Sequence, residues 1–537
     1  MITLLPNGRA ACPVSGLTAM QYRILSQQPS QYFSDKERRF TFVPTPLGLT
    51  TLVNSGIAIS DERLIGEAGR WSSFATGTRS QSQYGNVLNK TPWPHQDAAI
   101  DYAVHCPSPY MDMGMGTGKS LVTIGTLAAC NHRLNLILCP KAVVNVWPRE
   151  FRKHSRGDFA VVPLDQSSTK KKIEEARKWI RADPTEKLVF VNNYESAIQK
   201  DFREWAQTIK WDAVVPDETH RIKSPTGEAS KTCFSLLYKH PIGLSGTMLP
   251  HDPLDVWAQY RFLEPAIFGT SFVAFKKRYC ELGHFNEVKK FLQLEELHEK
   301  INLIRHHVPS TVLGLPPVTH QELRFELSPA TKKVYDKFKK ELIVEFAEGG
   351  MMSAANVLVR SVRLQQLTSG FFIDDTTGDA VQLDHRPKAA AFADWLDGVP
   401  RDKKAVVFCR FKHDIDIVKQ VIEKDGRVYG ELSGRRNDLT SDATFPPDVD
   451  VLAANLSSGG VGVDLTGASY GCYYSISHNR GEYDQSIARL NRPGQLDHVT
   501  FSHLIAEDTI DPEIYEAFEQ GRDLVQAVLG GLKCGAR

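Results

Sequence analysis

Short apolar runs alternate with segments of helical periodicity from Trp93 onward. Four of these runs, at 134–140, 187–194, 211–218 and 240–247, are almost continuously apolar and end in polar or small residues. Strands that are buried on both faces of a parallel sheet have this pattern, and the helical segments between them supply the crossovers. The pattern therefore predicts an α/β domain, in which ligands bind at the carboxyl ends of the strands.

The second half of the chain repeats the same alternation. Apolar runs at 403–411, 450–455 and 472–477 predict a second sheet domain. Residues 1–88 differ, because Pro and Gly interrupt their strand-like alternation and a polar stretch suited to a linker follows. We interpret them as a small separate unit with a solvated basic surface, although a DNA-contacting module is the alternative.

Charge balance, cysteine content and the lack of long apolar runs say little about function but indicate the type of protein. The 537 residues include 64 Lys and Arg against 63 Asp and Glu, so any attraction to nucleic acid must come from local patches. The nine cysteines are scattered singly without a CxxC pair, from which we expect reduced thiols and no zinc. The N-terminus does not resemble a signal peptide, and no run of 18 apolar residues occurs. We expect a cytoplasmic protein that does not contact a membrane.

The stretch MDMGMGTGKSL, at 111–121, has the order of a phosphate-binding loop. A short apolar lead-in, a glycine-rich turn and an apolar helix follow one another, so that backbone N–H groups and the helix dipole face a phosphate. Lys119 would reach the β- and γ-phosphates, and the Ser120 hydroxyl would hold Mg²⁺. Met113 stands where the strict pattern has its first glycine, and a glycine-rich helix entry without a ligand is the alternative.

The run WDAVVPDETH brings two adjacent carboxylates to the end of a predicted strand. Asp217 would hold Mg²⁺, and Glu218 would orient and deprotonate the attacking water. An isolated Asp-Glu pair is usually a solvated turn. Its place at a strand end, about a hundred residues after the phosphate loop, favours nucleotide hydrolysis instead.

The ordered motifs resemble those of superfamily-two helicases, and within them the Swi/Snf-type ATP-dependent DNA translocases, from about Pro92 to Glu516. Pro94-His95-Gln96 is similar to the family's glutamine motif, in which Gln96 would read adenine and Trp93 could stack nearby. The loop at 111–121 is similar to motif I and the segment 138–151 to motif Ia. PDETH is similar to motif II, where relatives usually have DEAH or DEGH, so Thr219 is a mild departure.

The stretch GLSGTMLPHDPLDVWAQYRFLEP, at 243–265, resembles motif III together with the helix that marks the Swi/Snf branch through its Trp257. The resemblance implies that Ser245, Gly246 and Thr247 couple the nucleotide site to the nucleic-acid track. Later amphipathic segments resemble the helical protrusions and bridge of relatives, and simple packing is the alternative for most of their residues.

The second half carries the remaining family motifs. KAVVFCRF resembles motif IV, and LSSGGVGVDLTGAS, at 456–469, resembles motif V with Asp464 in place of the family's usual Asn. QSIARLNRPGQ, at 485–495, is similar to motif VI. If the helix continues through it, Arg489 and Arg492 share one face and point across the cleft, with Arg492 as the first choice for the arginine finger. Arginine fingers in other phosphoryl-transfer proteins contribute about 10³- to 10⁵-fold in rate.

The resemblance implies an α/β fold of two RecA-like parallel-sheet lobes with helical insertions, plus a small N-terminal accessory domain. The expected divisions are an accessory domain and linker at 1–88, lobe 1 at 89–330 with an insertion at about 266–315, a helical bridge at 331–384 and lobe 2 at 385–537. The expected nucleotide contacts are Gln96, Gly114, Gly116, Thr117, Gly118, Lys119, Ser120, Gly462 and Asp464.

The resemblance also implies an ATP- and Mg²⁺-dependent hydrolase whose two lobes each hold part of the active site. ATP is expected to favour a closed cleft between the lobes, and hydrolysis to open it again. Each cycle would then move the lobes along double-stranded or branched DNA. The phosphate contacts expected of the DNA-binding surface come from Lys141, Arg149, Lys153 and Lys412. A strand-separating DNA or RNA helicase and an ATP-gated DNA clamp remain alternatives. The KKK run at 170–172 is expected to be a solvated helix face.

Overall fold

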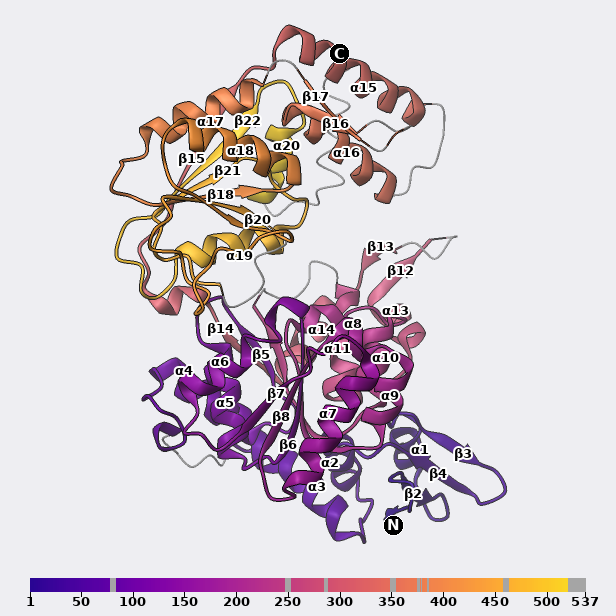
Figure 1. Cartoon of the computed structure of the whole chain (residues 1–537). Helices are drawn as coiled ribbons and strands as arrows, with labels where there is room; N and C mark the ends of the chain where they lie inside the picture. Colours follow the sequence, from indigo (N-terminus) through magenta and orange to yellow (C-terminus); the bar gives the residue numbers. More distant parts are fainter. Residues whose placement is uncertain are drawn as a thin grey trace. The chain divides into compact units, whose positions relative to one another are not determined.

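The computed structural model describes residues 1–77, 84–246, 253–283, 288–347, 354–373, 377, 379–383, 386–456 and 463–519. The chain divides into two compact units, Met1–Val312 and Leu313–Arg537. Each unit is built around parallel strands, as the alternating sequence pattern predicts (Figure 1).

The first unit begins with a small antiparallel sheet of order β1-β2-β4-β3. Its strands and three helices are β1 (Thr3–Leu4), β2 (Ala10–Pro13), α1 (Ala19–Leu25), β3 (Tyr32–Ser34), β4 (Arg39–Phe42), α2 (Pro46–Asn54) and α3 (Glu62–Ala75). The helices begin at side-chain caps; Thr18, for example, accepts from Gln21 N while Gln21 caps Thr18 N in return. The segment has its own apolar core and also binds the following α/β part, since Leu47 N donates to Glu264.

The α/β part of the first unit contains a five-stranded parallel sheet of order β10-β9-β6-β8-β7 and a three-stranded parallel sheet of order β11-β5-β14. A parallel bridge between Asp217 and Leu244 joins the two. The strands are β5 (Tyr110–Met113), β6 (Leu134–Cys139), β7 (Ala160–Pro163), β8 (Leu188–Asn193), β9 (Lys210–Pro216), β10 (Leu237–Pro241), β11 (Gly243–Ser245) and β14 (Arg305–Val308). The single run predicted at 240–247 is thus divided between two sheets.

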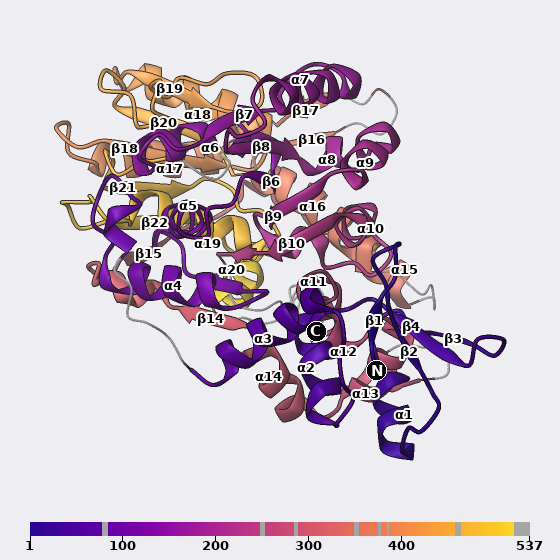
Figure 2. The same ribbon diagram turned by 90° about the horizontal axis from the view of Figure 1, so that it is seen from below.

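Helices cover both faces of these strands (Figures 1 and 2). The helices of this part are α4 (Pro94–His105), α5 (Lys119–Ala129), α6 (Trp147–His154), α7 (Thr169–Ala182), α8 (Tyr194–Ala197), α9 (Lys200–Gln207), α10 (Glu228–Ser235), α11 (Val256–Leu263), α12 (Pro265–Phe268), α13 (Phe272–Tyr279) and α14 (Leu294–Asn302). A hairpin of β12 (Cys280–Leu282) and β13 (Val288–Phe291) follows α13, and single 3₁₀ turns are η1 (Tyr84–Asn86), η2 (Lys141–Val143), η3 (Thr219–Ile222), η4 (Pro253–Asp255) and η5 (Ser310–Leu313).

The second unit contains a six-stranded parallel sheet of order β15-β22-β21-β18-β20-β19. Its strands are β15 (Thr319–Phe325), β18 (Ala405–Cys409), β19 (Tyr429–Leu432), β20 (Val451–Asn455), β21 (Tyr470–Tyr473) and β22 (Thr500–Ala506), with a hairpin of β16 (Phe371–Ile373) and β17 (Ala380–Gln382). Its helices are α15 (Pro329–Ala347), α16 (Ala354–Thr368), α17 (Pro387–Gly398), α18 (Lys412–Lys424), α19 (Arg480–Leu490) and α20 (Asp511–Glu519). The strand β15 belongs to this sheet, although the sequence analysis placed it in lobe 1.

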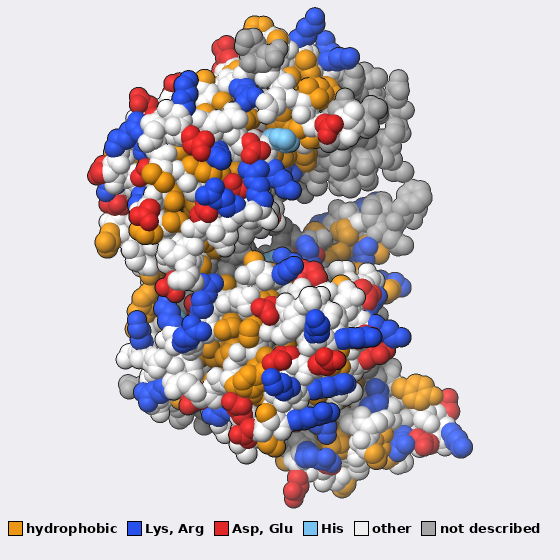
Figure 3. Space-filling model, viewed as in Figure 1, with side chains coloured by type: hydrophobic (Ala, Val, Ile, Leu, Met, Phe, Trp, Pro, Cys, Tyr) orange, Lys and Arg blue, Asp and Glu red, His pale blue; other side chains and the backbone are white. Residues whose placement is uncertain are grey.

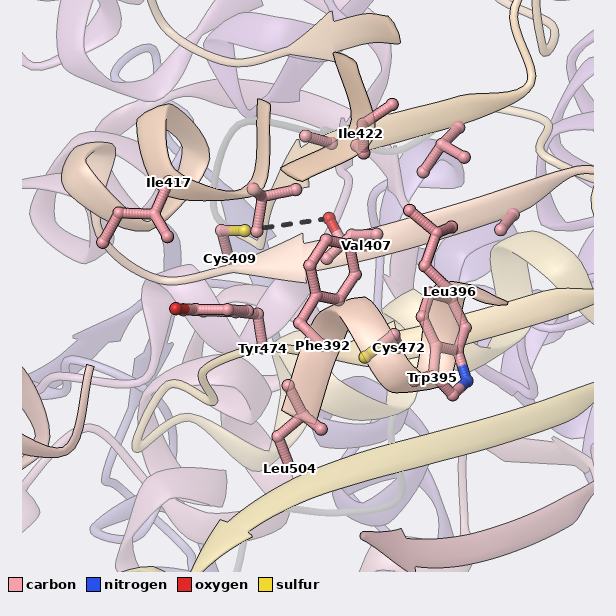
Figure 4. Packing of buried hydrophobic residues seen from close by; sticks show 14 of the residues in the cluster. Phe392, Trp395, Leu396, Val407, Cys409, Ile417, Ile422, Cys472, Tyr474 and Leu504 are labelled. Carbon is pink, nitrogen blue, oxygen red and sulfur yellow. Dashed lines mark hydrogen bonds between the residues drawn. The ribbon is translucent and has the colours of Figure 1, made fainter. Parts of the chain in front are cut away.

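The central strand β18 shows why these runs are continuously apolar. Val407 and Cys409 enter the core that Phe392 and Trp395 of α17 help to fill (Figure 4). Val406 and Phe408 point to the other face, toward residues of α19. Because successive side chains of a strand alternate between faces, burial on both faces requires apolar residues at every position.

The predicted fold class, α/β with two parallel-sheet lobes and a small N-terminal sheet, is confirmed. None of the helices that the structure describes is long and apolar enough to cross a bilayer.

Candidate nucleotide-binding site

The glycine-rich loop connects β5 to α5 at the carboxyl end of the strand. Gly116 and Gly118 have φ values of 76° and 98°, and Gly118 is the residue immediately before the helix. A Cβ atom on Gly118 would lie 2.4 Å from Nε2 of Gln96. Position 118 therefore requires glycine both for its backbone conformation and for the close approach of a side chain.

The departure from the strict phosphate-loop pattern has a structural reason. Met113 is the last residue of β5 and is completely buried, so it serves the core. Gly114 follows it, and a Cβ there would lie 2.6 Å from the backbone N of Ser310. The first glycine that the loop needs is therefore at 114, where the chain after β14 passes closely.

The Lys119 ammonium extends back across the loop. Its Nζ donates to the carbonyl of Met113 at 3.0 Å and to that of Gly114 at 3.4 Å. A Cβ atom on Gly246 would lie 3.0 Å from the same Nζ, so the segment after β11 also borders the lysine. Ser120 lies in the first turn of α5. The structure thus brings the predicted Lys119, Ser120 and Gly246 together.

Gln96 and Thr117 hold the loop to the start of α4. Gln96 Nε2 donates to the Thr117 carbonyl at 3.1 Å, and its Oε1 accepts from Trp93 N at 2.9 Å. The Thr117 hydroxyl donates to the Gly114 carbonyl at 2.7 Å, and His95 Nε2 lies 3.0 Å from the Thr117 carbonyl. Both ends of the Gln96 amide are engaged within the protein, which fixes the loop, and its contact with adenine stays a prediction.

Asp217 follows β9, and two aromatic side chains donate hydrogen bonds to it. Trp147 Nε1 donates to its Oδ2 at 3.3 Å, and the Tyr194 hydroxyl donates to its carbonyl at 2.9 Å. Burial, and then the neighbouring Glu218 carboxylate, raise the pKa of Asp217 above its ordinary value, while Lys119 opposes this shift. The tertiary structure identified Trp147 and Tyr194 as neighbours of the site; Trp147 lies in the segment that resembles motif Ia.

Glu218 has an unusual backbone and an unusual environment. Its φ is 55°, a left-handed conformation that costs a non-glycine residue free energy. The residue is 5% exposed, and among the described residues its Oε2 makes no hydrogen bond, although His220 Nδ1 lies 3.4 Å away. A buried carboxylate oxygen without a donor is costly for folding and is typical of a group that acts on a ligand.

Thr219, where relatives usually have Ala or Gly, makes a hydrogen bond that those residues cannot make. Its hydroxyl donates to the carbonyl of Leu244 at 2.7 Å, which is the residue before Ser245 on β11. This bond connects the carboxylate pair directly to the segment that resembles motif III. Ser245 is buried at the end of β11, and Thr247 lies outside the described residues.

An ion pair beneath the loop escaped the sequence analysis. Asp112 on β5 is 2% exposed and accepts from Arg305 Nε at 2.8 Å, with His307 Nδ1 at 3.0 Å. Both partners lie on β14, nearly 200 residues later in the chain, and β14 pairs with β5. No local signal in the sequence predicts this pairing, which supports the end of β5 just before the loop begins.

The second unit brings its two predicted nucleotide motifs together. Leu465 N donates to the Arg489 carbonyl at 3.1 Å, and Arg492 Nη1 donates to the Val463 carbonyl at 3.2 Å. The expectation of one shared helix face is wrong, because α19 ends at Leu490 and Arg492 lies beyond it. Proline at 493 cannot continue the hydrogen-bonding pattern of a helix, which is consistent with this early end.

Arg489 is the more enclosed of the two arginines. It is 6% exposed, its Nη1 makes no hydrogen bond to the described residues, and burial lowers its pKa to about 10. Asp464, by contrast, uses its carboxylate locally, since Oδ1 accepts from the backbone N and the hydroxyl of Thr466. Gly462 lies outside the described residues.

The basic residues predicted to contact DNA come from three elements of the chain. Lys141 follows the carboxyl end of β6 and Lys412 begins α18 after β18, and both are exposed, whereas Arg149 and Lys153 lie on α6. Lys and Arg are intermixed with Asp and Glu over the face drawn in Figure 3, in keeping with the near-zero net charge.

One residue of the KKK run is not solvated as expected. Lys172 is 7% exposed, and its Nζ donates to the side-chain oxygens of Asn192 and Asn193 at the end of β8. Burial lowers its pKa from the ordinary value. The sequence shows the charge run but not which side of α7 faces the sheet.

Comparisons with known proteins agree with this order of motifs. Residues 108–370 match the SNF2-related domain, and residues 388–494 match the helicase conserved C-terminal domain. An uncharacterised ATP-dependent helicase of Mycoplasma genitalium is 24% identical over 403 residues, covering 74% of this chain and 37% of the relative. A DNA annealing helicase and endonuclease of Mus musculus is 26% identical over 335 residues, covering 60% of this chain and 30% of the relative.

An ISWI chromatin-remodelling complex ATPase of Arabidopsis thaliana is 24% identical over 433 residues, covering 75% of this chain and 39% of the relative. The chain therefore spans less than half the length of these curated relatives. Among solved structures, a Sulfolobus solfataricus SWI2/SNF2 ATPase core in complex with double-stranded DNA aligns with 82% of this chain and 93% of that chain, at a TM-score of 0.41 and 20% identity.

Proposed function

The chain belongs to the SNF2-related family of superfamily-two helicases, which are ATP-dependent enzymes, and from this premise we propose that it hydrolyses ATP to move along double-stranded or branched DNA. The observation that carries the hydrolytic part of the proposal is Glu218. It is a buried, conformationally strained carboxylate with an oxygen that lacks a hydrogen-bond donor among the described residues, and it stands beside Asp217.

In the proposed mechanism each side chain has one task. Lys119, at the mouth of the glycine-rich loop, neutralises charge on the β- and γ-phosphates. Glu218 orients the attacking water and accepts its proton. A positioned general base of this kind contributes about 10²- to 10⁴-fold in rate.

The residues present fit Mg²⁺. The Asp217 carboxylate and the Ser120 hydroxyl are oxygen ligands of the type that Mg²⁺ prefers, and the raised pKa of Asp217 reflects a buried pair of carboxylates that a cation would stabilise. When bound, the ion would neutralise part of the phosphate charge. Trp147 would keep Asp217 oriented through its bond to Oδ2.

We further propose that Arg489 and Arg492 of the second unit contact the phosphates in the hydrolysing state. The buried Arg489 guanidinium has an Nη1 without a hydrogen bond to the described residues, which favours an anionic ligand for it. The Thr219–Leu244 bond offers a route by which the state of motif II reaches Ser245 and Gly246. Movement would then follow from alternating engagement of the second unit's arginines.

DNA as the track is supported by the names of two relatives, a DNA annealing helicase and a chromatin-remodelling ATPase. We propose phosphate contacts from Lys141, Arg149, Lys153 and Lys412, so binding should be insensitive to sequence and weakened by salt. A strand-separating helicase acting on DNA or RNA, and a clamp that binds DNA without moving, are the alternative functions.

One experiment tests the proposal and separates the alternatives. ATP turnover is measured with duplex, forked and four-way-junction DNA and with duplex RNA, and triplex displacement and strand unwinding are measured on the same DNA. We expect stimulation by duplex DNA together with triplex displacement and without strand separation, and loss of all turnover in Lys119→Ala. Stimulation by RNA alone, or an intact triplex despite turnover, would reject the proposed translocation on DNA.

A further inference from the structure

A cluster of one cysteine and two histidines lies in the first unit, apart from the motifs discussed above. Cys130 directly follows the last residue of α5, His132 lies between it and β6, and His240 lies on β10. Their potential ligand atoms, one sulfur and two ring nitrogens, all lie within 4.8 Å of one another. Two segments that are about 110 residues apart in the chain meet here because β10 and β6 both pair with β9.

The hydrogen bonds of the cluster define how the two rings are oriented. His240 Nε2 lies 3.2 Å from the carbonyl of Cys106, which can only accept, so Nε2 carries the proton. The other nitrogen, Nδ1, therefore presents its lone pair toward His132 Nε2, 3.0 Å away. A metal-binding histidine characteristically donates its second ring nitrogen to a carbonyl, as His240 does to Cys106.

The surroundings allow a cation to enter and to be held. His240 is buried, whereas Cys130 and His132 are half-buried, which leaves a path from solvent. Burial lowers the pKa of both histidines below the ordinary value, that of His132 to about 4. The two nearby cations are already paired, Arg70 with Glu67 at 3.0 Å and Lys239 with Asp212 at 2.8 Å.

We propose that Cys130 Sγ, His132 Nε2 and His240 Nδ1 bind a borderline-soft divalent cation, Zn²⁺ in the first instance, with water completing a tetrahedral site. Sulfur and imidazole ligands select this class of ion over Mg²⁺, which requires oxygen. Bond lengths of about 2.0–2.1 Å to nitrogen place two tetrahedral nitrogens roughly 3.3 Å apart, a few tenths of an ångström more than the spacing in the structure. Cys130 binds as the thiolate and its proton passes to solvent.

The site lies at the far end of the helix that starts at the glycine-rich loop. The eleven residues of α5 separate Lys119 from Cys130 by about 16 Å along the helix axis. A cation here would tie the end of α5 to β10 without touching nucleotide. Its expected effect is therefore on the stability of the first unit, and it is independent of the proposed ATPase mechanism.

The test uses the full chain, freed of metal with a chelator, and Zn²⁺ or Co²⁺ as the only added probes. Calorimetric titration should give one Zn²⁺ per chain, and Co²⁺ should give a thiolate-to-cobalt absorption band. Cys130→Ser should abolish this band, and both Cys130→Ser and His132→Asn should weaken Zn²⁺ binding by at least about tenfold. Matched controls are Cys280→Ser and His298→Gln, a buried cysteine and an exposed histidine of the same unit, which should bind the ion like the unaltered chain.

Circular dichroism of the metal-free variants establishes that they are folded. Zn²⁺ should raise the unfolding temperature of the unaltered chain and of both controls, but not that of Cys130→Ser or His132→Asn. The proposal is overturned if the unaltered chain binds neither ion, or if folded Cys130→Ser binds Zn²⁺ with unchanged affinity. The two histidines would in either case be a hydrogen-bonded pair that only stabilises the fold.

Discussion

Replacing Glu218 by glutamine isolates the chemical role of its carboxylate. Gln has the same length and the same Cβ, so the left-handed backbone and its strain persist. The change removes the proton acceptor, and turnover should fall about 10²- to 10⁴-fold if Glu218 is the general base. ATP affinity should stay within a few-fold, because Lys119 and the loop are untouched.

The same substitution should leave the protein at least as stable. A buried carboxylate oxygen that accepts no hydrogen bond from the described residues costs about 1–3 kcal/mol, and the neutral amide relieves part of this cost together with the repulsion from Asp217. We therefore expect the free energy of unfolding to stay unchanged or to increase by up to about 1 kcal/mol. The gain is limited because the amide also has to be accommodated in the buried site. Turnover would then fall while the free energy of unfolding stays the same or rises.

The assay combines DNA-stimulated ATP turnover, equilibrium ATP binding and urea unfolding of the same preparation. Glu174→Gln, an exposed carboxylate on α7, is the matched control for the charge change and should alter none of the three. Turnover within a few-fold of the unaltered enzyme would show that Glu218 is not the base. A loss of activity that parallels a loss of stability would assign Glu218 a structural role instead.

Three further predictions follow from the same geometry. Thr219→Ala should cost about 1–3 kcal/mol in urea unfolding, because the Leu244 carbonyl loses a buried donor, and Thr219→Ser should restore most of it. Gly118→Ala should destabilise by more than about 1 kcal/mol because of its φ of 98° and its crowded Cβ position, whereas Gly66→Ala, an uncrowded helix position, should be neutral or stabilising by up to about 1 kcal/mol in the same measurement. The pKa of Asp217 is raised in the folded state, so its protonation stabilises the fold. This contribution is complete below the unfolded-state pKa and is lost as pH rises through the folded-state pKa. The free energy of unfolding should therefore decline from pH 4 to 8, and Glu218→Gln should reduce that decline.

The elements around the site could be predicted because their signals are local. The loop at 111–121 combines an apolar strand, a glycine turn and a helix within a few residues, and the structure has β5 and α5 on either side of it. Asp217 and Glu218 stand at the end of a continuously apolar run, which becomes β9. Arg492 was misplaced on a helix because the spacing of two arginines does not reveal where the last helical hydrogen bond forms.

Contacts between distant segments were beyond the reach of the sequence pattern. The pattern shows that a strand is buried, but not which strands are its neighbours. The support of Asp112 by Arg305 depends on β14 pairing with β5, and the meeting of His132 with His240 depends on β9 lying between β6 and β10. Likewise, the sequence predicts a solvated Lys172 because it does not show which face of α7 packs on β8.

The amino-acid sequence by itself determined the parallel α/β class, the glycine-rich loop between a strand and a helix, and the carboxylate pair at a strand end, because hydrophobic periodicity and glycine placement act over a few residues. Only the tertiary structure decided that Glu218 is strained and has one oxygen without a hydrogen bond from the described residues, that Thr219 donates to Leu244, and that a cysteine and two histidines converge. These properties depend on packing, since burial removes water as a hydrogen-bonding partner and strand order decides which side chains replace it.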